Sequence, residues 1–170
     1  MPINQLDENG LIHVHFGSSI SNARKNVFKQ GLKILGDYIS SYRRAKDYYS
    51  LFGYDMLSIL STTGTVDVYY EKVPSWNTSS SAMGYTNSIT KNVVLNDPKM
   101  IGKYGNSASA AVAFTLAHEL GHWANITSPL NWFGRLNPEY KHIIGDRPLF
   151  HDSDGPYGYG AEVAVFGWIW

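Results

Sequence analysis

The residues best suited to chemistry are two histidines four positions apart, His118 and His122, with Glu119 directly after the first. Residues i and i+4 of a helix point the same way, so both imidazoles can bind one cation. Glu119 would lie beside that metal, where a carboxylate can take a proton from a water molecule. The chain has no cysteine, and zinc suits neutral imidazole in tetrahedral geometry. The motif predicts a Zn²⁺-dependent hydrolase of amide bonds, with Glu119 as general base.

The competing interpretation of the motif is a pair of surface histidines on an ordinary helix. Alanine-rich and apolar residues predict a helix over residues 107–126, so the histidines fall inside a regular element. Gly121 lies between the histidines, although glycine weakens a helix by roughly 1 kcal/mol relative to alanine. We therefore expect a strand or the substrate to pack tightly against the helix at this point.

A hydrolytic zinc site takes three protein ligands and keeps a fourth position open. We expect Glu162 as the third ligand, because it precedes a purely apolar run in which an acidic residue is hard to explain by packing. A carboxylate at the N-terminus of a final helix is the alternative explanation. Other candidates for the third ligand lie in the preceding loop, and they are Asp154, Asp152, His151 and Glu139.

Two tyrosines, Tyr157 and Tyr159, come just before Glu162. A hydroxyl near the zinc could donate a hydrogen bond to the tetrahedral oxyanion, so both tyrosines are catalytic candidates. In a chain with 12 tyrosines, packing is the competing role for each of them.

We expect the elements that must position these residues to form an α+β fold. We expect a small antiparallel or mixed sheet packed on the active-site helix, with further helices. We expect a helix from about residue 23 to residue 52, capped by Ser21 or Asn22 and interrupted or bent near Gly31 and Gly36. The other expected elements are strands at 11–16 and 66–73, a helical turn at 56–61, a strand or hairpin over 85–95 with a turn near Lys91, a long loop over 130–160 and a final helix over 161–170.

His13 and His15 are two residues apart on the first expected strand, so they share one strand face. Such a pair could bind a metal, and the competing interpretation is a polar strand face.

The bulk composition narrows the function further. A chain of 170 residues fits a single domain, residues 1–170, and 14 basic residues balance 14 acidic ones. We therefore expect no nucleic-acid partner. No apolar run of 18 residues occurs, so no transmembrane segment is expected, and the first residues lack the pattern of a signal peptide.

These residues give the chain a resemblance to the zincin metallopeptidases, and more closely to the gluzincin branch, in which a downstream Glu is the third zinc ligand. Within that branch it is similar to the compact metallopeptidase domains of bacterial secreted effectors and polymorphic toxins. The metzincin type fits less well, because Ser128 stands where that motif has its third histidine. The similarity covers about residues 56–168 and is carried by three stretches, 117–122, 93–98 and 162–165. The stretch 154–158 also resembles the Asp-x-x-Tyr-Gly of the aspzincins, which would make Asp154 the third ligand.

The resemblance implies a peptidase acting on a protein or peptide substrate, with a secretion-machinery carrier and an immunity protein as further partners. It also implies delivery by a specialised bacterial secretion system into the cytoplasm or periplasm of a target cell. We expect an extended substrate to lie antiparallel along a strand within 85–95. The alternatives are a zinc hydrolase of cell-wall peptide amides and a non-catalytic, zinc-containing binding module. Glu119 argues against the binding module, because a structural zinc site needs no base.

Overall fold

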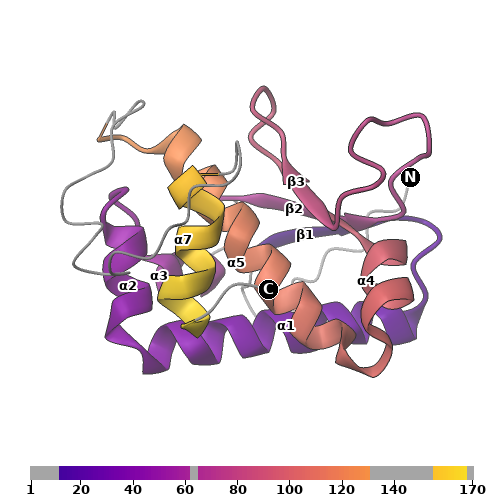
Figure 1. Cartoon of the computed structure of the whole chain (residues 1–170), viewed down its shortest axis with the longest axis horizontal. Helices are drawn as coiled ribbons and strands as arrows, with labels where there is room; N and C mark the ends of the chain where they lie inside the picture. Colours follow the sequence, from indigo (N-terminus) through magenta and orange to yellow (C-terminus); the bar gives the residue numbers. More distant parts are fainter. Residues whose placement is uncertain (1–11, 62–64, 131–154, 168–170) are drawn as a thin grey trace.

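Four short strands form one mixed sheet with helices packed on it (Figure 1). The computed structural model describes residues 12–61, 65–130 and 155–167. The strands are β1 (His13–Phe16), β2 (Asp67–Glu71), β3 (Gly84–Thr86) and β4 (Val93–Asn96), in the order β1-β2-β4-β3. β1, β2 and β4 are parallel, whereas β3 is antiparallel to β4. The expected α+β class with a small mixed sheet is confirmed.

The helices lie along one face of this sheet in Figure 1. They are α1 (Asn22–Ser41), α2 (Arg43–Ser50), α3 (Met56–Ser61), α4 (Asp97–Tyr104), α5 (Ala108–Thr127) and α7 (Gly155–Phe166), with a 3-10 turn over Gly105–Ser107. In the described part of the chain, no helix combines the length and the apolar character that crossing a bilayer requires.

The central helix α5 contacts α1, α7, β3 and β4 and is buried along most of its length. Such a helix belongs to the core, and its half-buried side chains, including His118 and His122, are where it borders a cleft. Glycines let its neighbours approach closely. A Cβ atom added at Gly31 of α1 would lie 2.5 Å from Cβ of Val112, and one added at Gly84 of β3 would lie 2.7 Å from Cγ2 of Thr115.

Most of the expected elements are confirmed, including the hairpin of β3 and β4, in which Lys91 has a positive φ of 63°. The interruption expected near Gly31 and Gly36 is wrong, because α1 continues through both glycines. The chain breaks at Tyr42 instead, where φ and ψ of −116° and 112° are extended. Packing against α5 holds Gly31 in the helix, which outweighs the weak helix propensity of glycine. The helix α4, which follows β4 directly, was not expected.

The final helix also begins earlier than expected, at Gly155 rather than at residue 161. A proline in the first turn of a helix is tolerated, since its missing N–H would have no partner there. Glu162 therefore lies in the middle of α7 and not at its N-terminus. The explanation of Glu162 as a favourable charge at a helix start is wrong.

Two glycines of α1 give a matched test of the packing on α5. Gly31→Ala should lower the free energy of unfolding by about 1–3 kcal/mol, because its methyl group meets Val112 and the carbonyl of Ser109. Gly36→Ala adds a methyl group with no atom within 4 Å, so it should raise that free energy by about 0.4–1 kcal/mol. Urea denaturation of both variants measures the difference. Equal stabilisation by the two substitutions would contradict the close approach of α1 to α5.

Candidate active site

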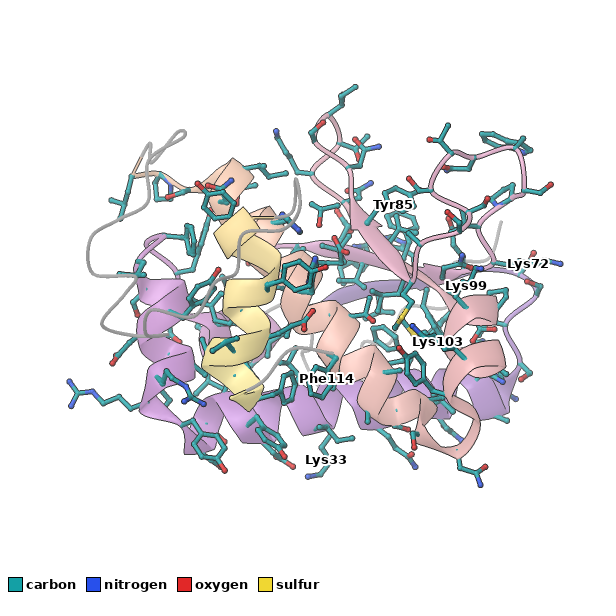
Figure 2. All side chains as sticks on the ribbon, viewed as in Figure 1. Lys33, Lys72, Tyr85, Lys99, Lys103 and Phe114 are labelled. Carbon is teal, nitrogen blue, oxygen red and sulfur yellow. The ribbon has the colours of Figure 1, made fainter. Side chains whose placement is uncertain are left out.

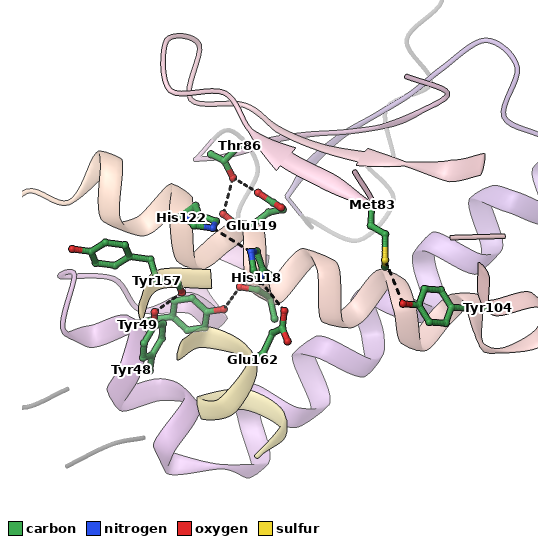
Figure 3. Close-up of polar contacts among 11 residues, drawn as sticks. Tyr48, Tyr49, Met83, Thr86, Tyr104, His118, Glu119, His122, Tyr157 and Glu162 are labelled. Atoms are coloured by element: carbon green, nitrogen blue, oxygen red, sulfur yellow. Dashed lines mark hydrogen bonds and ion pairs between the residues drawn. The ribbon is translucent and has the colours of Figure 1, made fainter. Parts of the chain in front are cut away.

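The helix α5 brings the two histidines of the motif together as expected (Figure 3). Nε2 of His118 lies 3.2 Å from Nε2 of His122, and the two ring centroids are 4.9 Å apart. Two nitrogens bound to one tetrahedral zinc at about 2.0–2.1 Å would lie about 3.3–3.4 Å apart. The spacing of the two nitrogens therefore fits a shared zinc ion with almost no movement of either ring.

Glu119 is only 6% exposed, and its carboxylate turns toward β3 (Figure 3). The hydroxyl of Thr86 lies 2.7 Å from Oε2 of Glu119 and 2.9 Å from the main-chain oxygen of the same residue. Burying a carboxylate is costly unless hydrogen bonds support it, and Thr86 supplies one. Sequence reasoning missed Thr86, because nothing in the sequence says that this position of the hairpin faces Glu119.

Glu162 meets the first histidine of the motif from α7. Its Oε1 atom lies 2.7 Å from Nδ1 of His118, and the residue is 5% exposed. When Nδ1 carries the ring proton it donates to this carboxylate and leaves Nε2 with the lone pair that a metal requires. Carboxylates commonly orient metal-binding histidines in this way.

The contact through Nδ1 differs from the one expected of a third ligand, which would place the carboxylate beside Nε2. A three-ligand metal site needs one ligand atom from each residue close to the other two. Among the described residues, His118, His122 and Glu162 do not form such a group within 4.8 Å. The role of Glu162 as third ligand therefore stays a prediction. The other candidates, Asp154, Asp152, His151 and Glu139, lie outside the described residues.

The tight packing expected at Gly121 is confirmed, but its source is α7 rather than a strand or the substrate. A Cβ atom added at Gly121 would collide with the carbonyl of Tyr157 and would lie 2.9 Å from Cβ of Ala161. One added at Gly158 would lie 2.6 Å from Cδ2 of His118 and closer still to Nε2. The two glycines let the helices touch, and the backbone of α7 thereby limits where the His118 ring can lie.

The two candidate tyrosines lie in different surroundings. Tyr159 lines the cleft beside the histidines, and its ring meets that of His118 edge-on at 5.1 Å between centroids. Tyr157 packs against Phe52 instead, and burial raises the pKa of its hydroxyl. Of the two, only Tyr159 is among the described residues that line the cleft.

Tyrosines of α2 tie α5 and α7 together beneath the histidines (Figure 3). Tyr48 donates to the main-chain oxygen of Tyr157 at 2.5 Å, and Tyr49 donates to that of Ala117 at 3.0 Å. Burial, with a further contribution from the negative charge of Glu162, raises the pKa of Tyr49 far above its ordinary value. Tyr49 is therefore always a neutral hydrogen-bond donor at this site.

A cleft of about 610 Å³ opens over the histidines between β3 and α5. Polar groups, among them His118, Glu119 and His122, share its lining about equally with apolar and aromatic side chains. Figure 2 shows three of the lining residues, Tyr85, Lys103 and Phe114, which come from β3, α4 and α5. A concave site in which several polar groups converge beside apolar walls is a candidate ligand-binding site.

Comparison of the chain with protein-family models, with curated proteins and with solved structures gave no match. The function must therefore be argued from the site itself.

The contact between Gly158 and His118 predicts how a single methyl group affects zinc binding. Gly158→Ala should displace the His118 ring and weaken zinc affinity by about tenfold or more, since the new carbon meets the ligand nitrogen. Gly102→Ala on α4 adds its methyl group to open space and serves as the control. A competitive titration with a chromogenic zinc chelator measures both affinities. Unchanged affinity in Gly158→Ala would show that α7 does not constrain the ring.

Proposed function

We propose that the chain is a zinc-dependent peptidase of the zincin type. The observation that carries the proposal is the 3.2 Å convergence of the Nε2 atoms of His118 and His122 beside the buried carboxylate of Glu119. A purely structural zinc site has no use for a carboxylate in that position. The combination of an imidazole pair and an adjacent base favours hydrolysis over metal storage or binding alone.

The donor set fits zinc, because it consists of two imidazoles with carboxylates nearby and no thiolate. His118 and His122 would hold the ion, and Glu162 or a carboxylate outside the described residues would complete its coordination. A zinc ion bound there would polarise the scissile carbonyl and lower the pKa of a bound water to about 7.

The residues of this chain would then carry the proton through the reaction. Glu119 accepts a proton from the attacking water while the oxygen of that water bonds to the carbonyl carbon. The same carboxylic acid donates that proton to the leaving amine nitrogen as the C–N bond breaks. The Thr86 hydroxyl, 2.7 Å from Oε2, would restrict the orientation of the Glu119 carboxylate during this transfer. Glu119 is 6% exposed and lines the cleft, so it would exchange this proton with groups in the cleft.

The edge strand β3 suits an extended peptide substrate. It pairs with β4 on one side only in the described part of the sheet, and it borders the cleft through Gly84, Tyr85 and Thr86. A peptide added antiparallel to β3 would satisfy its main-chain groups and pass its scissile bond over the histidines. The apolar walls at Met83 and Phe114 favour large apolar side chains in that peptide.

A protein target in another cell, delivery by a bacterial secretion system and an immunity partner are further parts of the proposal. They rest on the family resemblance of residues 117–122 and 162–165 alone. Cleavage of an unfolded protein substrate separates a peptidase from a hydrolase of cell-wall amides.

Replacing the base should separate zinc binding from turnover. Glu119→Gln keeps the size of the side chain but cannot accept a proton, so turnover of an unfolded protein should fall by about 10²–10⁴-fold. Zinc content should stay at the wild-type level, measured by elemental analysis. Thr86→Val should cause a smaller loss, about tenfold, because one hydrogen bond to a charged group is lost, and Thr86→Ser should restore activity.

Near-normal turnover in Glu119→Gln on a substrate that the wild type cleaves would remove Glu119 as the base. The same inactive variant permits a complex with an intact peptide. A peptide bound away from β3 in that complex would overturn the proposed substrate path.

The two roles open to Glu162 differ in how much zinc affinity they contribute. If Glu162 only orients His118 through Nδ1, Glu162→Gln should weaken zinc binding by about 10–100-fold, whereas loss of a ligand should cost far more. Asp154→Asn is titrated beside it as the rival ligand. Asp37→Asn, an exposed carboxylate on α1, is the control and should leave affinity unchanged. Loss of metal in Asp154→Asn with wild-type affinity in Glu162→Gln would rule out both roles for Glu162.

A further inference from the structure

A second group of metal-ligating side chains lies on the first two strands of the sheet. His13 and His15 alternate with Val14 along β1, so they share one face, and Asp67 of β2 stands directly opposite His13 in the parallel register. Side chains at opposed positions of neighbouring strands approach closely enough to interact. The sequence predicted the shared face of the two histidines, and the structure adds the carboxylate.

All three side chains converge on one point. Nδ1 of His13 lies 2.7 Å from Oδ1 of Asp67, and Nε2 of His15 lies 2.8 Å from the same oxygen. One ligand atom from each residue falls within 4.8 Å of the others, and among the described residues only this group of three does so. Ligand atoms bound to one tetrahedral zinc at about 2.0–2.2 Å lie about 3.3–3.6 Å apart, so each of these two contacts would have to lengthen by about 0.5–0.9 Å to admit an ion.

The His15 ring is held in place although one of its nitrogens is unsatisfied. The residue is 8% exposed and stacks on Tyr69 with 4.3 Å between ring centroids and 10° between planes. Its Nδ1 atom is buried without a hydrogen-bond partner, a costly condition. The fold therefore directs Nε2 of His15 toward Asp67, although Nδ1 is left without a hydrogen bond. A preorganised metal ligand is held in this way, whereas a polar side chain on a strand surface would turn to satisfy both nitrogens.

Asp67 completes the group with a negative charge. Its partial burial on its own raises the pKa, but hydrogen bonds from His15 and His13 outweigh that effect and leave the pKa below its ordinary value. The side chain of Asp67 is 44% exposed and that of His13 is 30% exposed, so water can reach this side of the group. Two imidazoles, one carboxylate and an open side match the ligand preference of zinc and of neighbouring divalent transition metals, not that of calcium or magnesium.

We propose that His13, His15 and Asp67 form a second divalent transition-metal site, which takes Zn²⁺ and cross-links β1 to β2. The site is separate from the histidines of α5. Strands β1 and β3 stand at opposite edges of the four-stranded sheet, three spacings or about 14 Å apart. Val68 and Tyr70 of β2 are buried toward the helices, with Tyr70 against Phe28 of α1, so Asp67 and Tyr69 face the other way.

A metal at this site would strengthen the junction between β1 and β2, which pair over four residues. β1 is a four-residue edge strand, and a bound ion fixes it to β2 through both of its polar side chains. Because the ion binds the folded state with all three ligands in place, it should raise the melting temperature of the chain.

The experiment uses the full chain without a histidine tag, with Zn²⁺ as the probe and Co²⁺ as a spectroscopic substitute. The double variant His118→Ala/His122→Ala removes the α5 pair and should still bind one Zn²⁺ and gain melting temperature from it. Adding Asp67→Asn, which keeps the shape of the side chain, should weaken that binding by more than about 100-fold and abolish the gain. Glu71→Gln, on the same strand face two positions beyond Tyr69, is the matched control and should change neither.

The outcomes are distinct from those that test the peptidase. If the double variant binds no Zn²⁺ and shows no Co²⁺ absorption while the wild type binds one ion, the sheet site is refuted and the α5 site stands. If Asp67→Asn alone removes the only bound ion, the sheet site stands and the peptidase proposal fails. His15→Gln is a second variant on the sheet, and equal zinc affinity in a folded His15→Gln and its parent would also refute the site.

Discussion

The close packing of α7 on α5 is the constraint on which the candidate active site depends. Gly121 and Gly158 remove the side chains that would hold the helices apart, so the backbone of each helix reaches the other. At that distance Glu162 extends to Nδ1 of His118, and Tyr48 and Tyr49 fix both backbones from below. A single added methyl group is enough to disturb this geometry, because a packed interior has no room to absorb it.

Two buried carboxylates flank the histidines from opposite sides, and each has its own hydrogen-bond partner. Glu119 meets the Thr86 hydroxyl on β3, whereas Glu162 meets the imidazole of His118. Two such charges near one another are costly in a low dielectric unless a cation balances them. Under the proposed function, a divalent ion bound by His118 and His122 would offset part of that negative charge.

The local parts of the structure were predictable from the sequence, and the contacts between distant segments were not. Spacing alone placed His118, Glu119 and His122 on α5, because helical periodicity is a local property. The start of α7 was misplaced by six residues, since Tyr157, Gly158 and Tyr159 have weak helix propensity and form a helix only against α5. Thr86 and Asp67 could not be foreseen, because strand order and register decide which side chains they face.

The two edge strands of the described sheet, β1 and β3, differ in what lies beside them. An unpaired edge invites association with another strand, and proteins either cover it or use it. At β3 the edge borders the cleft, where pairing with a peptide would serve catalysis. At β1 the polar groups converge on Asp67, and a metal there would stiffen the edge without covering it. The metal at the α5 histidines would thus act on the substrate, and the metal at β1 would stabilise the fold. Because the two sites lie at opposite ends of the sheet, loss of one metal need not remove the other.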